Sequence, residues 1–243
     1  SRTDEVQVEL DGDRVVLEHP WVRGSISADG ETVLHLASHP SALGLAMRLV
    51  VAVQAVRSGS LLVDMPAVLT NGGAHLLAGQ GMSRAMHRAA AAGRLLVSDC
   101  SVLLTRSAGV WYAESISCNR PMPAARRGRI EAIWQLSDSG ESTELISKAS
   151  VVCTIMDHAV VPVRSLEAAR AVFDVAASVA CAVPSARTFV GGRRKMWDQL
   201  DALAAAIGMR AGLLTASDPP ADGSIGGKAA LAHSFGRVEQ PKR

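Results

Sequence analysis

The stretch HLLAGQGMSRAM, residues 75–86, decides how this sequence is read. An apolar run is followed by two glycines, Gly79 and Gly81, and then by an alanine-rich segment that ends at Gly93. This order predicts a buried strand, a tight glycine turn and the start of a helix. Backbone N–H groups at such a helix start can point at a phosphate, and glycine lets the chain curl around it. The stretch therefore raises the question whether this turn binds phosphate.

The usual phosphate loop reads G-x-x-x-x-G-K-[ST], where the lysine neutralises the outer phosphates and the hydroxyl helps to hold Mg²⁺. We match Arg84 to the lysine and Ala85 to the hydroxyl residue. Arginine keeps the charge but donates from a larger planar fork, and alanine cannot bind a metal ion. Two interpretations stay open. Gly79, Gly81, Ser83 and Arg84 form a phosphate site, or the glycines only allow an ordinary turn to pack closely.

Outward from this turn, strand and helix patterns alternate along the chain. Residues 6–19 predict a hairpin around an Asp-Gly turn, and residues 101–115 predict a second hairpin. Leu43, Met47 and Val50 recur at helical spacing. The remaining expected strands cover residues 31–37, 61–79, 94–99 and 128–136, and the remaining expected helices cover 83–92, 165–181 and 193–208. These elements predict an α/β fold with an antiparallel contribution from the hairpins.

The pattern predicts three parts of the chain. Residues 1–40 form an N-terminal β-hairpin lobe, and residues 41–210 form the α/β core. Residues 211–243 include the stretch TASDPPADGSIGG, whose Pro, Gly, Ser and Asp content is typical of a flexible tail.

Composition limits the classes of protein that fit. Hydrophobic residues make up 48% of the 243 residues and aromatic residues only 3%, so we expect a core of Ala, Val and Leu. A net charge of +2 gives no argument for nucleic-acid binding. The longest apolar stretch, residues 43–56, is too short to span a membrane. The four cysteines form no C-x-x-C pair and the N-terminus is not signal-like, so we expect free thiols, no metal site and a cytoplasmic protein.

Residues 67–115, which contain the glycine turn, resemble the HPr kinase/phosphorylase family and its small kinase-like relatives. That family shares its core with the phosphoenolpyruvate carboxykinases. LLVSDC matches the family strand that ends in two aspartates, with Asp99 as the first of them. GRIEAIWQL and VACAVPSARTFV are similar to two later strands, so the resemblance extends over roughly residues 60–195. It implies a phosphate-loop α/β core of the HPr kinase/carboxykinase type.

The resemblance also implies roles for individual residues. Asp99 would be the catalytic base, and Arg120, Arg126 and Arg127 would belong to a loop that lies over the active site and meets a substrate or partner. Read from the residues alone, Asp99 could equally cap a turn, and the arginines could lie on a solvated loop. The segment Met156-Asp157-His158 holds an acid and a histidine, which do not make a catalytic triad.

Three departures from the family pattern bear on activity. The Lys-Ser pair reads Arg84-Ala85, the second aspartate is Cys100, and Asp64 stands where the family has a histidine. Catalysis of phosphoryl transfer is almost entirely electrostatic positioning. Loss of one well-placed donor can cost about 3–4 kcal/mol of transition-state stabilisation. These losses together predict a degenerate member without kinase activity.

We therefore expect a protein that acts by protein binding or scaffolding. Its partner is another protein or a second copy of the chain. We expect no cofactor and no nucleic acid or membrane partner. An anion or nucleotide could still rest on the turn beside Arg84 without a metal ion. The alternative is an active phosphotransferase that uses ATP and Mg²⁺ on a hydroxyl of a small molecule, peptide or protein. In that case Asp99 is the base.

Overall fold

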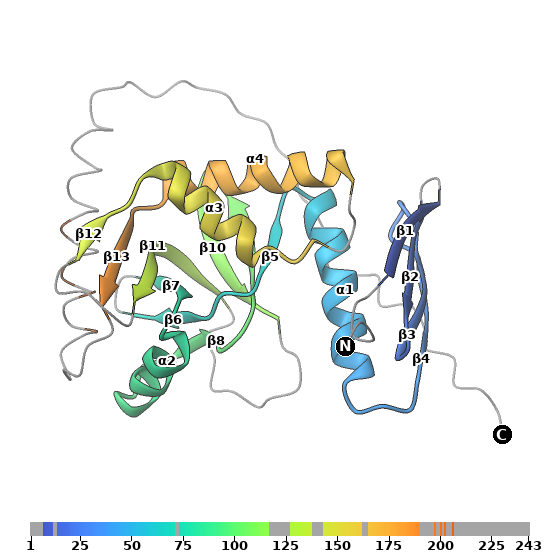
Figure 1. Ribbon diagram of the computed structural model, residues 1–243, viewed down its shortest axis with the longest axis horizontal. Helices are drawn as coiled ribbons and strands as arrows, with labels where there is room; N and C mark the ends of the chain where they lie inside the picture. Colours follow the sequence, from blue (N-terminus) through green and yellow to red (C-terminus); the bar gives the residue numbers. More distant parts are fainter. Residues whose placement is uncertain are drawn as a thin grey trace.

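A computed structural model of the chain contains two β-sheets joined by a helix (Figure 1). It describes residues 7–11, 14–70, 73–116, 127–137, 143–161 and 165–189, together with Trp197, Leu200, Ala202 and Ala206. The expected tail at 211–243 lies outside the described residues. The mixture of helices with parallel and antiparallel strands confirms the predicted α/β class.

The smaller sheet is an antiparallel meander of four strands in chain order. Its strands are β1 (Gln7–Asp11), β2 (Arg14–His19), β3 (Val22–Ile26) and β4 (Thr32–Leu36). The predicted hairpin and the strand at 31–37 are confirmed as β1, β2 and β4. The sequence did not predict β3, because Gly24 interrupts the alternation of apolar side chains that marks a strand.

Helix α1 (Ala42–Arg57) packs against this sheet and against the larger one. Its residues Leu49 and Val53 form a buried cluster with Val15, Leu17 and Ile26 of the small sheet. Figure 1 shows α1 between the two sheets. The division into a lobe at 1–40 and a core at 41–210 stays a prediction.

The larger sheet has the strand order β5-β9-β10-β11-β7-β6-β8, and β13 pairs with both β11 and β12. The hairpin predicted at 101–115 is confirmed, because β9 pairs antiparallel with β10. The strands expected within 61–79 include β6 and β7, which also pair antiparallel. The strands are β5 (Leu61–Val63), β6 (Ala67–Leu69), β7 (Ala74–Gly79), β8 (Leu96–Ser98), β9 (Val102–Ser107), β10 (Val110–Ser115), β11 (Arg127–Ser137), β12 (Glu144–Leu145) and β13 (Ser185–Phe189).

Five strands of this sheet, β7, β8, β9, β11 and β13, run in one direction; β9 shares it with β11 because both are antiparallel to β10. β11 is parallel to β7 and to β13. β8 points the same way as β7, because both are antiparallel to β6. The carboxyl ends of β7, β8, β11 and β13 therefore lie along the same edge of the sheet. In open α/β sheets ligands bind at this edge.

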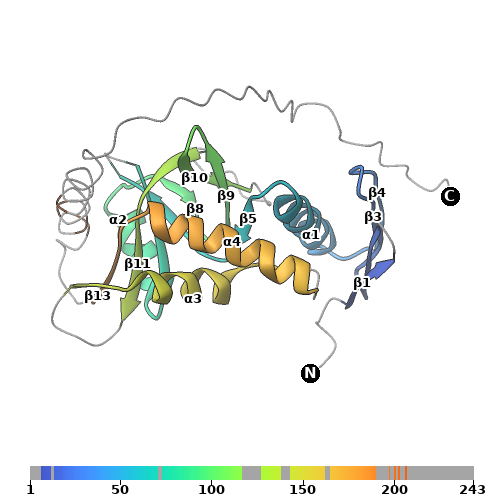
Figure 2. The ribbon, with the colours of Figure 1, turned by 90° about the horizontal axis from the view of Figure 1, so that it is seen from above.

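Helices cover both faces of the sheet (Figures 1 and 2). Leu76 and Leu77 of β7 are both fully buried on opposite faces. Leu76 packs with α3 (Lys148–His158) and α4 (Leu166–Ala182), and Leu77 packs with α2 (Met82–Ala91). The predicted helix at 165–181 is confirmed as α4, whereas α3 was not predicted. Of the helix predicted at 193–208, Trp197 and Leu200 are helical and buried as expected, and the residues around them lie outside the described part.

Candidate functional site

The glycine turn lies between a strand and a helix, as predicted. β7 ends at Gly79, and Gly81 immediately precedes α2. Both have a positive φ, +88° and +90°, which favours glycine. A Cβ on Gly79 would lie only 2.6 Å from the carbonyl oxygen of Leu136 on β11. Close approach of β11 therefore requires glycine at position 79, whatever the turn binds.

The turn is shorter than a phosphate loop. Only Gln80 and Gly81 separate β7 from α2, whereas the G-x-x-x-x-G-K-[ST] pattern has four residues between its glycines. In that pattern the lysine follows the last glycine at the start of the helix. Counted this way, Met82 takes the lysine position and Ser83 the hydroxyl position. This count from the helix start keeps the hydroxyl but not the lysine, whereas the match of Arg84 and Ala85 stays a prediction.

The first turn of α2 nevertheless has the polarity of an anion site. Ser83 and Arg84 are exposed there, while Ala85 is fully buried against the sheet. The turn carries no acidic residue, and no side chain caps the helix N-terminus. Orphan N–H groups and the helix dipole both favour a negative charge at such a position.

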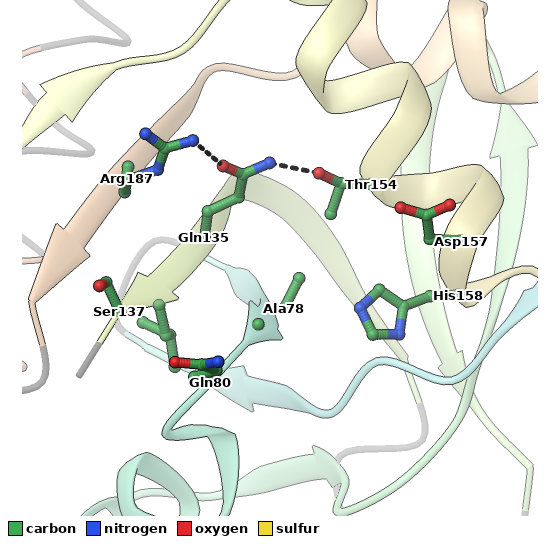
Figure 3. Close-up of a pocket in the computed structure, with 10 residues that line it drawn as sticks. Ala78, Gln80, Gln135, Ser137, Thr154, Asp157, His158 and Arg187 are labelled. Carbon is green, nitrogen blue, oxygen red and sulfur yellow. Dashed lines mark hydrogen bonds between the residues drawn. The ribbon is translucent and has the colours of Figure 1, made fainter. Parts of the chain in front are cut away.

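A pocket of about 420 Å³ opens beside the glycine turn, at the carboxyl ends of three parallel strands (Figure 3). Strands β7, β11 and β13 and helix α3 supply its walls. The lining residues are Ala78, Gly79, Gln80, Gln135, Leu136, Ser137, Thr154, Asp157, His158 and Arg187. The pocket therefore has the position that parallel sheets commonly use for ligands.

One wall of the pocket is a chain of hydrogen bonds. Arg187 donates from Nη2 to Oε1 of Gln135 over 3.0 Å, and the Gln135 amide donates to the Thr154 hydroxyl (Figure 3). The Nη1 atom of Arg187 also forms a 3.0 Å ion pair with Glu144 on β12. These contacts hold the guanidinium in place at the pocket rim. Glu144 offsets part of its positive charge.

Helix α3 forms another wall. Thr154, Asp157 and His158 recur at i, i+3 and i+4, which places them on one side of the helix. Figure 3 shows the His158 ring on the side of the pocket next to Ala78, and Gln80 from the glycine turn at its base. Within the described ranges, no hydrogen bond or ion pair engages the side chains of Asp157 and His158. The pocket thus offers one guanidinium, one imidazole, two amides and two hydroxyls, with Asp157 as the carboxylate in its lining.

Asp99 lies apart from this pocket. It is exposed, directly after β8, at the same sheet edge as Gly79 but with β6 in between. Two strand spacings put these strands about 10 Å apart. The turn after β8 is fixed by Ser98, whose hydroxyl oxygen accepts from the N–H groups of Cys100 and Ser101 at 3.3 Å.

Asp64, which stands where the resembled family has a histidine, is held by three other elements. Its carboxylate forms an ion pair with Arg48 of α1 and accepts from the Ser101 hydroxyl at 2.7 Å. Its backbone N–H donates to the His158 carbonyl at 2.7 Å. Asp64 therefore joins α1 to the turn after β8 and to the end of α3, next to the pocket.

Arg127 lies at the opposite end of β11 from the pocket. It is the first residue of that strand and Ser137 is the last, so full extension separates them by roughly 30 Å. Its guanidinium forms a 3.2 Å ion pair with Glu114 and lies 3.8 Å from the centre of the Tyr112 ring. The structure therefore does not bring Arg127 to Gly79. Arg120 and Arg126 lie outside the described residues.

Of the predicted phosphate-binding residues Gly79 lines the pocket, and so do Asp157 and His158 of the segment that the sequence analysis judged too small for a triad. The pocket residues Gln135, Thr154 and Arg187 were missed, because they lie on three elements far apart in the chain. A signal was present on α3, where the i, i+3, i+4 spacing from Thr154 to His158 could have indicated a polar helix face.

Two features are absent from the described part of the chain. No group of three or more His, Cys, Asp or Glu side chains gathers there in a way that could hold a metal ion. None of the described helices is both long enough and apolar enough to cross a membrane.

Comparison with known proteins gives similarity at the level of structure. No family model matches the chain, and no curated protein matches it at a significant level. Among solved structures, the chain is similar to the HPr(Ser) kinase/phosphatase from Coxiella burnetii, with a TM-score of 0.34 and 9% sequence identity. The match covers 64% of this chain and 99% of that one. At this TM-score the similarity carries no argument about activity.

Proposed function

We propose that this protein acts by binding, and that its pocket accepts a small anion or an anionic group of a protein partner without transferring a phosphoryl group. The pocket beside the glycine turn supports this proposal. It is lined by Arg187, whose guanidinium is held in place, and by the turn that leads into the uncapped N-terminus of α2. Charge-assisted hydrogen bonds from arginine are the strong contacts in anion recognition.

The geometry of the turn supports binding over catalysis. Met82 provides no charge where a phosphate loop has lysine, and a turn of two residues leaves little chain to wrap a phosphate. Asp64 is already engaged by Arg48 and Ser101. A binding protein needs none of these groups, whereas a kinase needs several of them together.

The alternative function is an ATP-dependent phosphotransferase. One observation favours it. Asp99, the proposed base, lies at the same sheet edge as Gly79, and Ser83 retains a hydroxyl at the start of α2. In that case Mg²⁺ and ATP would bind at this edge, with Ser83 and Asp99 as the oxygen donors available to the metal ion.

Titration calorimetry with inorganic phosphate tests the proposed site. We expect measurable binding to the native chain and a loss of at least about tenfold in affinity for Arg187→Gln, since each charge-assisted hydrogen bond contributes about 1.5–3 kcal/mol. Arg170→Gln is the matched control, because Arg170 is exposed on α4 and lines no part of the pocket. Equal affinity for the native chain and Arg187→Gln would refute the assignment of this pocket.

A further inference from the structure

Strand β4 is an open edge of the small sheet. Among the described strands it pairs with β3 alone. The N–H of Ala37 donates to Trp21, and the carbonyl of Glu31 accepts from Ser27, both at 2.9 Å. Because hydrogen-bonded pairs alternate along an antiparallel ladder, the odd-numbered residues of β4 bond to β3. The backbone N–H and C=O groups of Thr32, Leu34 and Leu36 therefore point away from the sheet.

This edge lacks the features that usually block edge-to-edge pairing. Natural edges carry charged side chains, proline or a bulge. The strand reads TVLHL, without an Asp, Glu, Lys, Arg or Pro, and its register with β3 is continuous from Thr32 to Leu36. The strand also shows large apolar side chains to solvent, since Val33 is 52% and Leu36 is 42% exposed.

Helix α1 adds two more apolar side chains near this edge. Leu43 is 54% and Met47 is 36% exposed, one helical turn apart. They share a stripe of α1 with Gln54, and a Cβ on Gly30 in the β3–β4 turn would lie 3.7 Å from the Gln54 amide nitrogen. Figure 2 shows α4 on the β1 side of α1, so the described elements leave its β4 side open.

We propose that β4 pairs with β4 of a second copy of this chain, antiparallel and centred on Leu34, to form a continuous eight-stranded sheet. In this register Leu34 lies opposite Leu34 of the second copy, and Thr32 lies opposite Leu36. All three outward-facing residues of each copy then find partners, which gives up to about six backbone hydrogen bonds. The edge is complementary to itself, as a two-fold interface requires.

Side chains on both faces suit this pairing. Thr32, Leu34 and Leu36 share the face that packs on α1, because their partners on β3 include the buried Val22 and Ile26. In the pair, Leu43 and Met47 of both copies would cover this face at the junction. On the other face Val33 lies opposite His35 of the second copy, so no two side chains of like charge face each other.

Sedimentation velocity of the full chain over a range of concentrations tests this interface. We expect a monomer–dimer equilibrium whose dissociation constant rises at least about tenfold in Leu36→Lys/Met47→Lys. Leu166→Lys on α4 is the matched control, because Leu166 is 89% exposed and belongs neither to the small sheet nor to α1, and it should leave the equilibrium unchanged. Equal thermal unfolding midpoints would show that the variants fold.

Amide hydrogen exchange resolved by residue locates the contact independently of any substitution. The amides of Val33 and His35 should be protected at every concentration, and those of Thr32, Leu34 and Leu36 only where the dimer forms. A chain that stays monomeric up to about 1 mM overturns the proposal. A dimer in which the three outward amides exchange freely, or which Leu36→Lys/Met47→Lys does not weaken, also overturns it.

Discussion

Gly79 at the end of β7 lies so close to Leu136 of β11 that a Cβ on the glycine would come within 2.6 Å of the Leu136 carbonyl oxygen. This contact sets the geometry of the candidate site, because it brings the glycine turn and the last residues of β11 to one wall of the pocket. The glycine is needed for packing, so its presence alone does not indicate phosphate binding.

Alanine at position 79 should destabilise the fold strongly. The residue would be strained at φ +88°, which costs roughly 1–2 kcal/mol, and its Cβ would also displace backbone, so we expect a total loss above about 2 kcal/mol. Gly93→Ala is the control, because Gly93 has φ +69° but nothing within 4 Å of the added Cβ. It should lose only about 1 kcal/mol. Urea unfolding of both variants measures the difference, and equal losses would contradict the packing role of Gly79.

The ion pair between Arg48 and Asp64 should have a small coupling energy, whereas loss of the Asp64 side chain should lower the unfolding free energy by more. Both side chains are about 40% exposed, which limits the pair to about 0.5–1 kcal/mol. Asp64→Ala also removes the hydrogen bond from Ser101, so it should cost about 1–2 kcal/mol in unfolding free energy. A double-mutant cycle with Arg48→Ala measures the coupling. We expect a coupling energy larger than that of the more exposed Arg187–Glu144 pair. A coupling energy of zero would argue against a link from α1 through Asp64 to the turn after β8.

The turn before β4 should respond to acid. The Ser27 hydroxyl and then the Glu31 backbone N–H donate to Asp29, and they lower the pKa of its carboxyl below the usual 3.8. A carboxyl whose pKa is lower in the folded than in the unfolded chain stabilises the fold at pH values above its unfolded pKa. This stabilisation is lost as the pH falls through the folded pKa. An NMR titration should give a midpoint below 3.8 for Asp29 and a rise toward it in Ser27→Ala. An unchanged midpoint in Ser27→Ala would show that the serine is not the main cause.

Removal of the carboxylate beside Arg187 should strengthen anion binding. Glu144 pairs with Nη1 of Arg187, so Glu144→Gln leaves more of its charge for a ligand in the pocket. Because exposed pairs contribute about 0.2–1 kcal/mol, we expect phosphate affinity to rise about two- to fivefold, less at high salt. Calorimetry of the two proteins at two salt concentrations measures this. Weaker binding would mean that Glu144 is needed to hold Arg187 in position.

Local signals in the sequence predicted much of the fold. The Ser-Ala-Gly stretch at 107–109 marks the turn between β9 and β10, and Gly79 and Gly81 mark the turn before α2. Turn chemistry is local, so a single sequence can carry it. Helix α3 was missed because β-branched Val151, Val152, Thr154 and Ile155 weaken the helical signal.

The candidate site depends on contacts that no local signal records. Gln80, Ser137, His158 and Arg187 come together only because β11 is parallel to both β7 and β13. The match of Arg84 to a lysine stays a prediction for a related reason. The expected helix began at residue 83 and the observed one begins at Met82, and the start of a helix is uncertain by at least that much from sequence.

Calorimetric titration with ATP and Mg²⁺, followed by an assay of released phosphate, tests whether the protein binds anions without transferring a phosphoryl group. We expect ATP with Mg²⁺ to bind no more tightly than ATP without the metal ion, and we expect no phosphate to be released. Micromolar affinity that depends on Mg²⁺, together with turnover that Asp99→Asn abolishes, would contradict it and assign the chain to the active kinases.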